Sequence, residues 1–236
     1  MDVLSHSGYE QMVQGARALA KNAWGVSVMQ LVDGQWAKLF RPPRLLSSAR
    51  FYPYAVRFQH AARELKKRGV RTVEVTAVWR VKGLNRHVVV YRPVDGMELR
   101  ELLADAARRS RLLPALSGFI AELHRKGVYF RSLHLGNVLW CPDDVFALID
   151  VSATRFKPRP LPPLLRARSF KRMCNYEQDR QALQSYGFTA FMRRYLDEAG
   201  LPASTQRTFL RCLRRRCPEF QQSLLPLINN QEVIRV

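Results

Sequence analysis

The pattern of hydrophobic and polar residues divides this chain of 236 residues into a strand-rich first part and a mostly helical second part. Apolar and polar side chains alternate over residues 26–31, which is typical of a half-buried strand. An Asp-Gly turn follows within residues 32–35, and residues 36–40 have the composition of a return strand. The pattern therefore predicts a β-hairpin over residues 26–40.

After this hairpin the apolar side chains change to helical spacing. We predict a helix over residues 49–68, with an early helical turn at Pro53 and an end at Gly69. Two more strands are predicted at residues 72–79 and 87–92. The first part therefore consists of strands with one helix between them.

Residues 93–96, Pro-Val-Asp-Gly, end the strand pattern, and a basic loop rich in proline is predicted after Asp150. The order of elements predicts an α+β fold with two lobes that form a single domain over residues 1–236. The strand-rich N-terminal lobe spans about residues 1–93, and the mostly helical C-terminal lobe spans about residues 97–236. The helices and short strands predicted in the C-terminal lobe cover residues 99–107, 112–126, 138–140, 146–149, 177–186, 188–199 and 205–215.

The charge of the chain limits the kind of partner it binds. Its formal net charge of +20 favours an anionic partner, which could be nucleic acid, a phosphorylated glycan or an acidic membrane surface. A nucleic-acid partner is disfavoured, because the sequence has no zinc pattern, no RNA-binding signature and no basic element with interleaved aromatic residues. The hydrophobic fraction of 47% is normal for a folded protein and argues against wholesale disorder.

Cysteine usage and the N-terminal residues bear on the compartment. The 4 cysteines form no CxxC pair, which argues against zinc and against a disulfide framework. Residues 1–6 lack the features of a secretory signal, and no apolar run approaches the ~20 residues that span a bilayer. We expect a reduced, cytoplasmic protein, and peripheral contact with the inner membrane stays open.

The strongest chemical signal is the run Arg-Ser-Leu-His-Leu-Gly-Asn-Val-Leu at residues 131–139, followed by Leu-Ile-Asp at residues 148–150. Kinases place a metal-binding Asn shortly after the catalytic base and a metal-binding Asp after a short hairpin. Asn137 and Asp150 occupy these positions, and their side-chain oxygens are suitable ligands for Mg²⁺. The alternative is a turn Asn and an Asp at a strand end. The spacing of the whole assembly favours the metal site.

Three residues of the N-terminal lobe are candidates for binding the nucleotide. Lys38, on the predicted return strand, could pair with the α- and β-phosphates, or it could be an exposed lysine of the strand. Glu64 is the only acid of the predicted helix and could be the partner of Lys38, or it could pair with Lys67 or Arg68 at close helical spacing. Tyr91 begins the predicted hinge between the lobes.

The candidate catalytic residues are Ser132, His134 and Arg131. Ser132 stands where a kinase loop carries its Asp base. His134 either shapes the loop through a hydrogen bond or replaces the missing base, because the pKa of a histidine is ordinarily near neutral. His124 is expected to be structural and to anchor the end of its helix.

These residues, in this order, resemble the lipopolysaccharide core kinase family, bacterial enzymes that phosphorylate heptose or Kdo sugars and have a protein-kinase-like fold. The resemblance covers about residues 20–200 and is strongest over residues 119–152. Residues 38–41, 44–49 and 127–137 are similar to segments of small family members labelled toluene tolerance proteins. The resemblance implies ATP and Mg²⁺ as cofactors and a phosphorylated glycolipid, the lipopolysaccharide core, or an anionic inner-membrane surface as partner.

The sequence also departs from the family pattern. Phe130 and Ser132 replace the usual His and Asp, and no glycine-rich loop is present. Two functions therefore stay open, an ATP-dependent sugar kinase and a pseudokinase that binds a nucleotide or a partner. The basic segment after Asp150 is expected to be an acceptor or membrane surface, with a solvated loop as the alternative; its cations are Arg155, Lys157, Arg159, Arg166, Arg168, Lys171 and Arg172.

Overall fold

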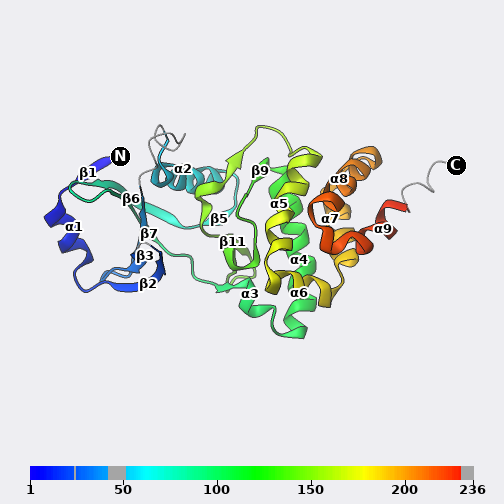
Figure 1. Cartoon of the computed structure of the whole chain (residues 1–236), viewed down its shortest axis with the longest axis horizontal. Coiled ribbons are helices and arrows are strands. Elements are labelled where there is room, and N and C mark those ends of the chain that lie inside the picture. Colours follow the sequence, from blue (N-terminus) through cyan, green and yellow to red (C-terminus); the bar gives the residue numbers. More distant parts are fainter. Residues whose placement is uncertain (24, 42–51, 230–236) are drawn as a thin grey trace. The chain divides into compact units, whose positions relative to one another are not determined.

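The computed structural model describes residues 1–23, 25–41 and 52–229, and it divides into two compact units (Figure 1). The first unit consists of Met1–Asp95 and Asp150–Ala153, and the second of Gly96–Ile149 and Thr154–Val236. Strands dominate the first unit and helices the second, so the predicted α+β class is confirmed. The segment 44–49, which contributed to the family resemblance, lies outside the described residues.

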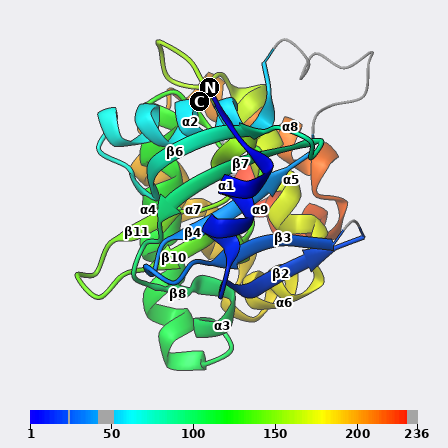
Figure 2. The ribbon, with the colours of Figure 1, turned by 90° about the vertical axis from the view of Figure 1, so that its left-hand side faces the viewer.

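In the described residues, the first unit forms a six-stranded sheet with the order β1-β6-β7-β4-β3-β2, visible in Figure 2. β1 and β6 pair in parallel, and all other neighbours are antiparallel. The strands are β1 (Asp2–Leu4), β2 (Arg17–Asn22), β3 (Gly25–Gln30), β4 (Trp36–Phe40), β6 (Glu74–Val81) and β7 (Arg86–Arg92); a short strand β5 spans Arg71–Thr72.

The predicted hairpin is confirmed as β3 and β4. Its turn contains Gly34 at φ 82°, a conformation that glycine adopts without strain. The carboxylate of Asp33 accepts a hydrogen bond from the backbone N–H of Gln35 at 2.9 Å. The register places Lys38 opposite Val28 on β3 and Val89 on β7, so Lys38 lies inside the sheet rather than at its edge.

Two helices pack against this sheet. Helix α1 (His6–Val13), which was not predicted, begins at Ser5, whose hydroxyl accepts a hydrogen bond from the N–H of Gly8. Side chains of α1 pack on the core of the sheet, formed by Met29, Leu31, Ala37, Val81, Val88 and Val90. Helix α2 (Tyr54–Lys67) packs on β6 and β7. Pro53 is its N-cap, and the Pro53 carbonyl oxygen accepts a hydrogen bond from the N–H of Arg57 at 2.9 Å, so Pro53 marks the first helical turn as predicted; residues 49–51 lie outside the described residues.

The second unit is a set of packed helices with two small sheets. Helix α4 (Ala106–Arg125) packs on α7 (Phe188–Ala199), and α5 (Pro163–Asn175) packs on α8 (Ala203–Arg216) (Figure 1). Within this unit β11 (Phe146–Leu148), β10 (Val138–Trp140) and β8 (Met97–Glu98) lie side by side, and β9 (Val128–Tyr129) pairs with β12 (Arg155–Phe156). The other helices are α3 (Leu99–Leu102), α6 (Glu177–Tyr186) and α9 (Gln221–Asn229).

Three predictions for the second unit are wrong. The helix predicted over residues 99–107 is interrupted, because α3 ends at Leu102 and residues 103–105 form a turn and a bend. Helix α4 begins at Ala106 and not at residue 112, because the Asp105 carboxylate accepts a hydrogen bond from the N–H of Arg108 and caps the helix. The basic loop after Asp150 also ends earlier than predicted. Pro163 begins helix α5, since proline fits the first turn, where its missing N–H is not needed. Among the described residues no helix is long and apolar enough to cross a membrane.

Candidate functional site

The first unit brings Lys38 and Asp150 together although they are far apart in the sequence. The Lys38 Nζ donates a hydrogen bond to Asp150 Oδ1 at 2.7 Å. The same Nζ lies 5.7 Å and 5.8 Å from the ring centroids of Phe40 and Phe58. Aromatic faces stabilise a cation at such distances, so the ammonium group has a defined position.

Asp150 has an unusual backbone conformation. Its φ is 51°, in the left-handed region that non-glycine residues rarely adopt and that Asp tolerates better than most. It begins the segment Asp150–Ala153, whose 3₁₀ turn packs on α2 in the same unit. Backbone strain of this kind persists where the surrounding structure enforces it, and it is concentrated at functional sites.

Lys38 and Asp150 lie on the wall of a cavity of about 560 Å³ in the first unit. Val26 and Val28 of β3 supply apolar wall, and Ser152 lies beside the acid. Ligand sites typically combine such a volume with mainly apolar walls and a few polar groups that fix orientation. The cavity therefore combines a volume in the usual range of ligand sites with one ion pair on its wall.

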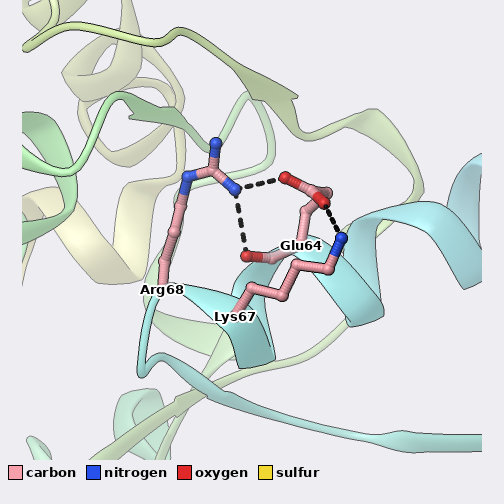
Figure 3. Close-up of polar contacts among 3 residues, drawn as sticks. All are labelled: Glu64, Lys67 and Arg68. Atoms are coloured by element: carbon pink, nitrogen blue, oxygen red, sulfur yellow. Dashed lines mark hydrogen bonds and ion pairs between the residues drawn. The ribbon is translucent and has the colours of Figure 1, made fainter.

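Glu64 does not contact Lys38 in the structure. Its carboxylate forms ion pairs with Lys67 Nζ at 3.0 Å and with the guanidinium of Arg68, as Figure 3 shows. The hydrogen bonds from Arg68 and Lys67 lower the pKa of Glu64 to about 2. Of the two interpretations of Glu64, the structure shows the local pairs, with Lys67 of α2 and with Arg68 at its C-cap, and the carboxylate partner of Lys38 is Asp150.

Tyr91 is buried in the first unit near the charged pair. Its ring packs on Phe58, with centroids 5.5 Å apart, and lies edge-on to Trp36 at 6.2 Å. Burial raises the pKa of Tyr91, and the negative charge of Asp150 raises it further. The hydroxyl group is therefore protonated at neutral pH. The ring of Tyr91 packs on Phe58, the ring that Lys38 Nζ approaches.

The loop that carries Ser132, His134 and Asn137 lies in the second unit. Asn137 is buried, and its Nδ2 donates a hydrogen bond to the backbone oxygen of Ser132 at 3.0 Å. The backbone oxygen of Asn137 accepts from the N–H of Ile149 at 3.1 Å, at the base of the β10–β11 hairpin. The bond from Nδ2 fixes the orientation of the carboxamide, and the backbone bond holds the residue at the hairpin. Arg131 is exposed at the start of the loop.

Two residues that the sequence interpretation missed hold this loop. The Asp179 carboxylate, fully buried on α6, accepts hydrogen bonds from the backbone N–H of Leu135 and from Arg100 Nε, each at 2.7 Å. The Arg100 guanidinium also lies 5.1 Å from the ring of Tyr176. The helical spacing of Asp179 and Leu183 on one buried side of α6 was the available signal.

Arg100 also determines what His134 can do. Its NH2 group is 3.2 Å from His134 Nδ1, and a guanidinium can only donate, so Nδ1 accepts. In the neutral imidazole the hydrogen then resides on Nε2, and neither nitrogen has a lone pair available for a substrate proton. The ring also packs on Tyr176, with centroids 4.6 Å apart. This geometry favours the loop-shaping role of His134.

His124 and Arg166 belong to a buried network in the second unit. His124 Nδ1 is 2.8 Å from the Tyr195 hydroxyl, and its Nε2 is 2.7 Å from Ser169 Oγ. The structural role predicted for His124 is confirmed. Arg166 donates to the Leu161 backbone oxygen at 2.7 Å and to the Tyr195 hydroxyl at 3.0 Å. Arg166 is therefore not part of a basic surface, and its assignment to one is corrected, because its side chain fills the core.

Comparisons with known proteins identify what the chain is similar to. Residues 18–195, which include Lys38, Ser132, Asn137 and Asp150, match the model of the Lipopolysaccharide kinase (Kdo/WaaP) family. A comparison with curated protein sequences gave no match.

Two similar solved structures are kinases. The first is the kinase PK-1 of Cydia pomonella granulovirus, at 13% identity and a TM-score of 0.37 over 64% of this chain. This chain covers 56% of that kinase, which is less than two thirds of its length. The second is a divergent Toxoplasma kinase that lacks the glycine-rich loop and regulates membrane ultrastructure of the parasitophorous vacuole. It has 15% identity and a TM-score of 0.49 over 85% of this chain and 82% of that chain.

Proposed function

The chain belongs to the lipopolysaccharide kinase (Kdo/WaaP) family, and on that premise we propose that it binds ATP with Mg²⁺ and transfers phosphate slowly to a sugar of the lipopolysaccharide core. The observation that carries the proposal is the Lys38–Asp150 pair on the cavity wall of the first unit. A lysine cation beside an acid is what phosphoryl transfer requires near the nucleotide phosphates.

In the first unit, the carboxylate oxygens of Asp150 fit a bound magnesium ion. In the second unit, Asn137 keeps its carboxamide oxygen available, since its nitrogen is engaged by the backbone of Ser132, and its role as a ligand is what the family resemblance implies. Oxygen atoms are the ligands that Mg²⁺ prefers. When bound, the ion would neutralise charge on the phosphates, while Lys38 would hold them in position.

The reaction is expected to be slow because Ser132 cannot act as the missing base. A serine hydroxyl does not accept a proton at neutral pH, and the lone pair of His134 Nδ1 is directed to Arg100. General-base help contributes about 10²–10⁴ in rate, or roughly 3–5 kcal/mol of barrier. Positioning and electrostatics contribute comparably in phosphoryl transfer, so binding survives the loss and some transfer remains.

The second candidate is a pseudokinase that binds nucleotide without transfer. It is favoured by the serine at the base position, Ser132, and by the engagement of His134 Nδ1 by Arg100. The two functions differ in turnover but share the nucleotide site. A single series of variants therefore tests the site first and turnover second.

The first experiment is calorimetry of ATP binding in the presence and absence of Mg²⁺. We expect Lys38→Ala and Asp150→Asn to weaken binding at least tenfold, because each removes one half of the ion pair. Lys67→Ala is the matched control, since it removes a lysine of the same unit that is 72% exposed and distant in sequence from the pair. Unchanged affinity in Lys38→Ala and Asp150→Asn, or no binding by the folded protein, would refute the site.

The second experiment measures transfer of labelled γ-phosphate to purified core glycolipid. We expect weak transfer by the natural chain and an increase in Ser132→Asp of up to about 10²-fold, within the range that a general base supplies. Transfer that is absent in both proteins despite Mg²⁺-dependent ATP binding would favour the pseudokinase.

A further inference from the structure

Helices α5 and α8 of the second unit have an unusual charge composition. The two helices pack on each other, with the rings of Phe170 and Phe209 6.1 Å apart. Helix α5 contains four Lys or Arg residues, α8 contains five, and neither contains an acid. Balanced surface helices usually alternate charges of both signs, so this composition points to a function of the cations.

Six of these cations are exposed, and they have the same spacing on both helices. The positions i, i+3 and i+4 of a helix lie on one side of it. We use the name α5–α8 basic face for these six residues, three on the exposed side of each helix: Arg168, Lys171 and Arg172 of α5, and Arg211, Arg214 and Arg215 of α8. The opposite sides of both helices are buried, for example at Phe170 and Phe209.

The cations of the basic face are not neutralised within the part of the chain that the structure describes. None of the six forms an ion pair or a hydrogen bond through its side chain there. Arginines elsewhere in the second unit do have acidic partners, as Arg194 has Glu198 and Arg111 has Asp144. The basic face therefore keeps its full positive charge available to a partner.

Apolar side chains lie beside these cations. Arg214 and Arg215 line a groove of about 360 Å³ together with Gln221, Gln222 and Leu225 of α9. On α5, Leu164 is 46% exposed one helical turn before Arg168. The exposed Leu164 and the half-buried Leu225, both next to arginines, suit the boundary between lipid headgroups and acyl chains, where cations meet phosphates and apolar side chains meet hydrocarbon.

We infer that the α5–α8 basic face docks the protein on a bilayer rich in anionic phospholipids. The charge complementarity favours an anionic surface, and the leucines favour a membrane over nucleic acid. Proteins that bind single-stranded nucleic acid rely on exposed aromatic rings for stacking, whereas the aromatic residues Phe209 of α8 and Phe220 before α9 are buried. This docking is independent of nucleotide binding and of phosphate transfer.

The test is co-sedimentation of the full chain with vesicles of phosphatidylcholine, with and without phosphatidylglycerol, in the absence of nucleotide. We expect binding only to the anionic vesicles. The triple variant Arg211→Gln/Arg214→Gln/Arg215→Gln should bind on the order of 100-fold more weakly, because each cation near an anionic surface contributes roughly a fivefold factor. Arg168→Gln/Lys171→Gln/Arg172→Gln on α5 should show a loss of similar size.

The matched control is Arg63→Gln/Lys66→Gln/Lys67→Gln on α2, which removes the same charge from exposed positions with the same i, i+3, i+4 spacing. It should change vesicle binding no more than a few-fold. Equal losses of vesicle binding in the α2 control and in the α8 variant would show that binding depends only on the net charge of the protein, and this would overturn the inference. Displacement from the vesicles by duplex DNA at lower concentration, with DNA binding lost in the same α8 variant, would assign the face to nucleic acid instead. Because ATP is absent, failure here leaves the proposed function untouched, and thermal unfolding verifies that each variant is folded.

Discussion

Replacement of Asp179 tests how the loop with Ser132, His134 and Asn137 is held. The carboxylate is fully buried, and each of its oxygens accepts one hydrogen bond of 2.7 Å, from Arg100 Nε and from the Leu135 N–H. In Asp179→Ala both donors lose their acceptor. In Asp179→Asn the side-chain oxygen can still accept one bond, but the amide nitrogen faces a donor.

The loss of unfolding free energy in the two Asp179 variants depends on how exposed the two donors, the Leu135 N–H and Arg100, are to water. Leu135 is buried, so its unpaired N–H costs about 1–3 kcal/mol. Removal of one partner from a fully buried ion pair costs about 3–5 kcal/mol, but Arg100 is 24% exposed and water reaches part of it, so its share is smaller. We expect a loss of unfolding free energy of roughly 3 kcal/mol in Asp179→Ala and roughly 2 kcal/mol in Asp179→Asn.

The assay is urea unfolding of each variant, combined with hydrogen exchange of the Leu135 amide. The control is Asp144→Asn, which breaks the ion pair with Arg111, in which both side chains are about two thirds exposed (66% and 67%), and keeps a residue type that tolerates the left-handed φ of 58° at this position. Exposed pairs contribute little, so this control should lose less than about 1 kcal/mol. Equal losses in Asp179→Asn and Asp144→Asn, or a Leu135 amide that exchanges equally fast in Asp179→Ala and in the natural chain, would refute the reasoning.

Three further predictions concern pH and backbone geometry. Burial, and secondarily the charge of Arg166, hold the pKa of His124 well below its ordinary value, so its contribution to stability is complete above the unfolded pKa near 6.5 and is lost as pH falls. Urea unfolding at pH 7 and pH 5.5 should show that, below pH 6.5, the unfolding free energy of the natural chain falls by about 1.4 kcal/mol per pH unit more than that of His124→Gln. Equal slopes in the two proteins would contradict this. The pKa of Glu64 is lowered to about 2, so its contribution is present above about pH 4.5 and lost toward pH 2; Glu64→Gln should cost about 1 kcal/mol at pH 7, after allowance for solvent around its partners, and almost nothing at pH 2. A Cβ on Gly127 (φ 71°) would lie 2.2 Å from the Lys157 carbonyl oxygen, so Gly127→Ala should lower the unfolding free energy by more than about 3 kcal/mol. Gly200 (φ 58°) has open space around it, so Gly200→Ala should cost only about 1–2 kcal/mol. Similar melting temperatures for the two variants would show that the backbone at Gly127 relaxes without cost.

Sequence reasoning located helices well where apolar spacing and end signals agree. Helices α6 and α7 have the predicted bounds, and Gly187 and Gly200, both at positive φ, end them. It failed at α5, because prolines before Pro163 suggested a continuous loop and the helix start was not recognised. It also failed at α1, which has only a short periodic pattern and no buried residue.

The candidate site was only partly predictable for a different reason. The interpretation named Lys38 and Asp150 singly, but their contact depends on the return of Asp150–Ala153 to the first unit, which no local pattern encodes. For Glu64 the local pairs with Lys67 and Arg68 were foreseen as an alternative. The spacing of Asp179 and Leu183 indicated only that Asp179 lies on the buried side of its helix; its hydrogen bond to Arg100, 79 positions away in the sequence, leaves no local signal.

The discontinuous first unit has a consequence for how the protein is synthesised. Its two stretches, Met1–Asp95 and Asp150–Ala153, are separated by Gly96–Ile149. The ribosome therefore synthesises all residues of the six-stranded sheet well before it adds Asp150. At about 5–20 residues per second, Lys38 waits several seconds for its partner. The Lys38–Asp150 pair on the cavity wall is therefore among the last features of the first unit to form. A nascent chain stalled between Asp95 and Asp150 would have the sheet with Lys38 but without Asp150.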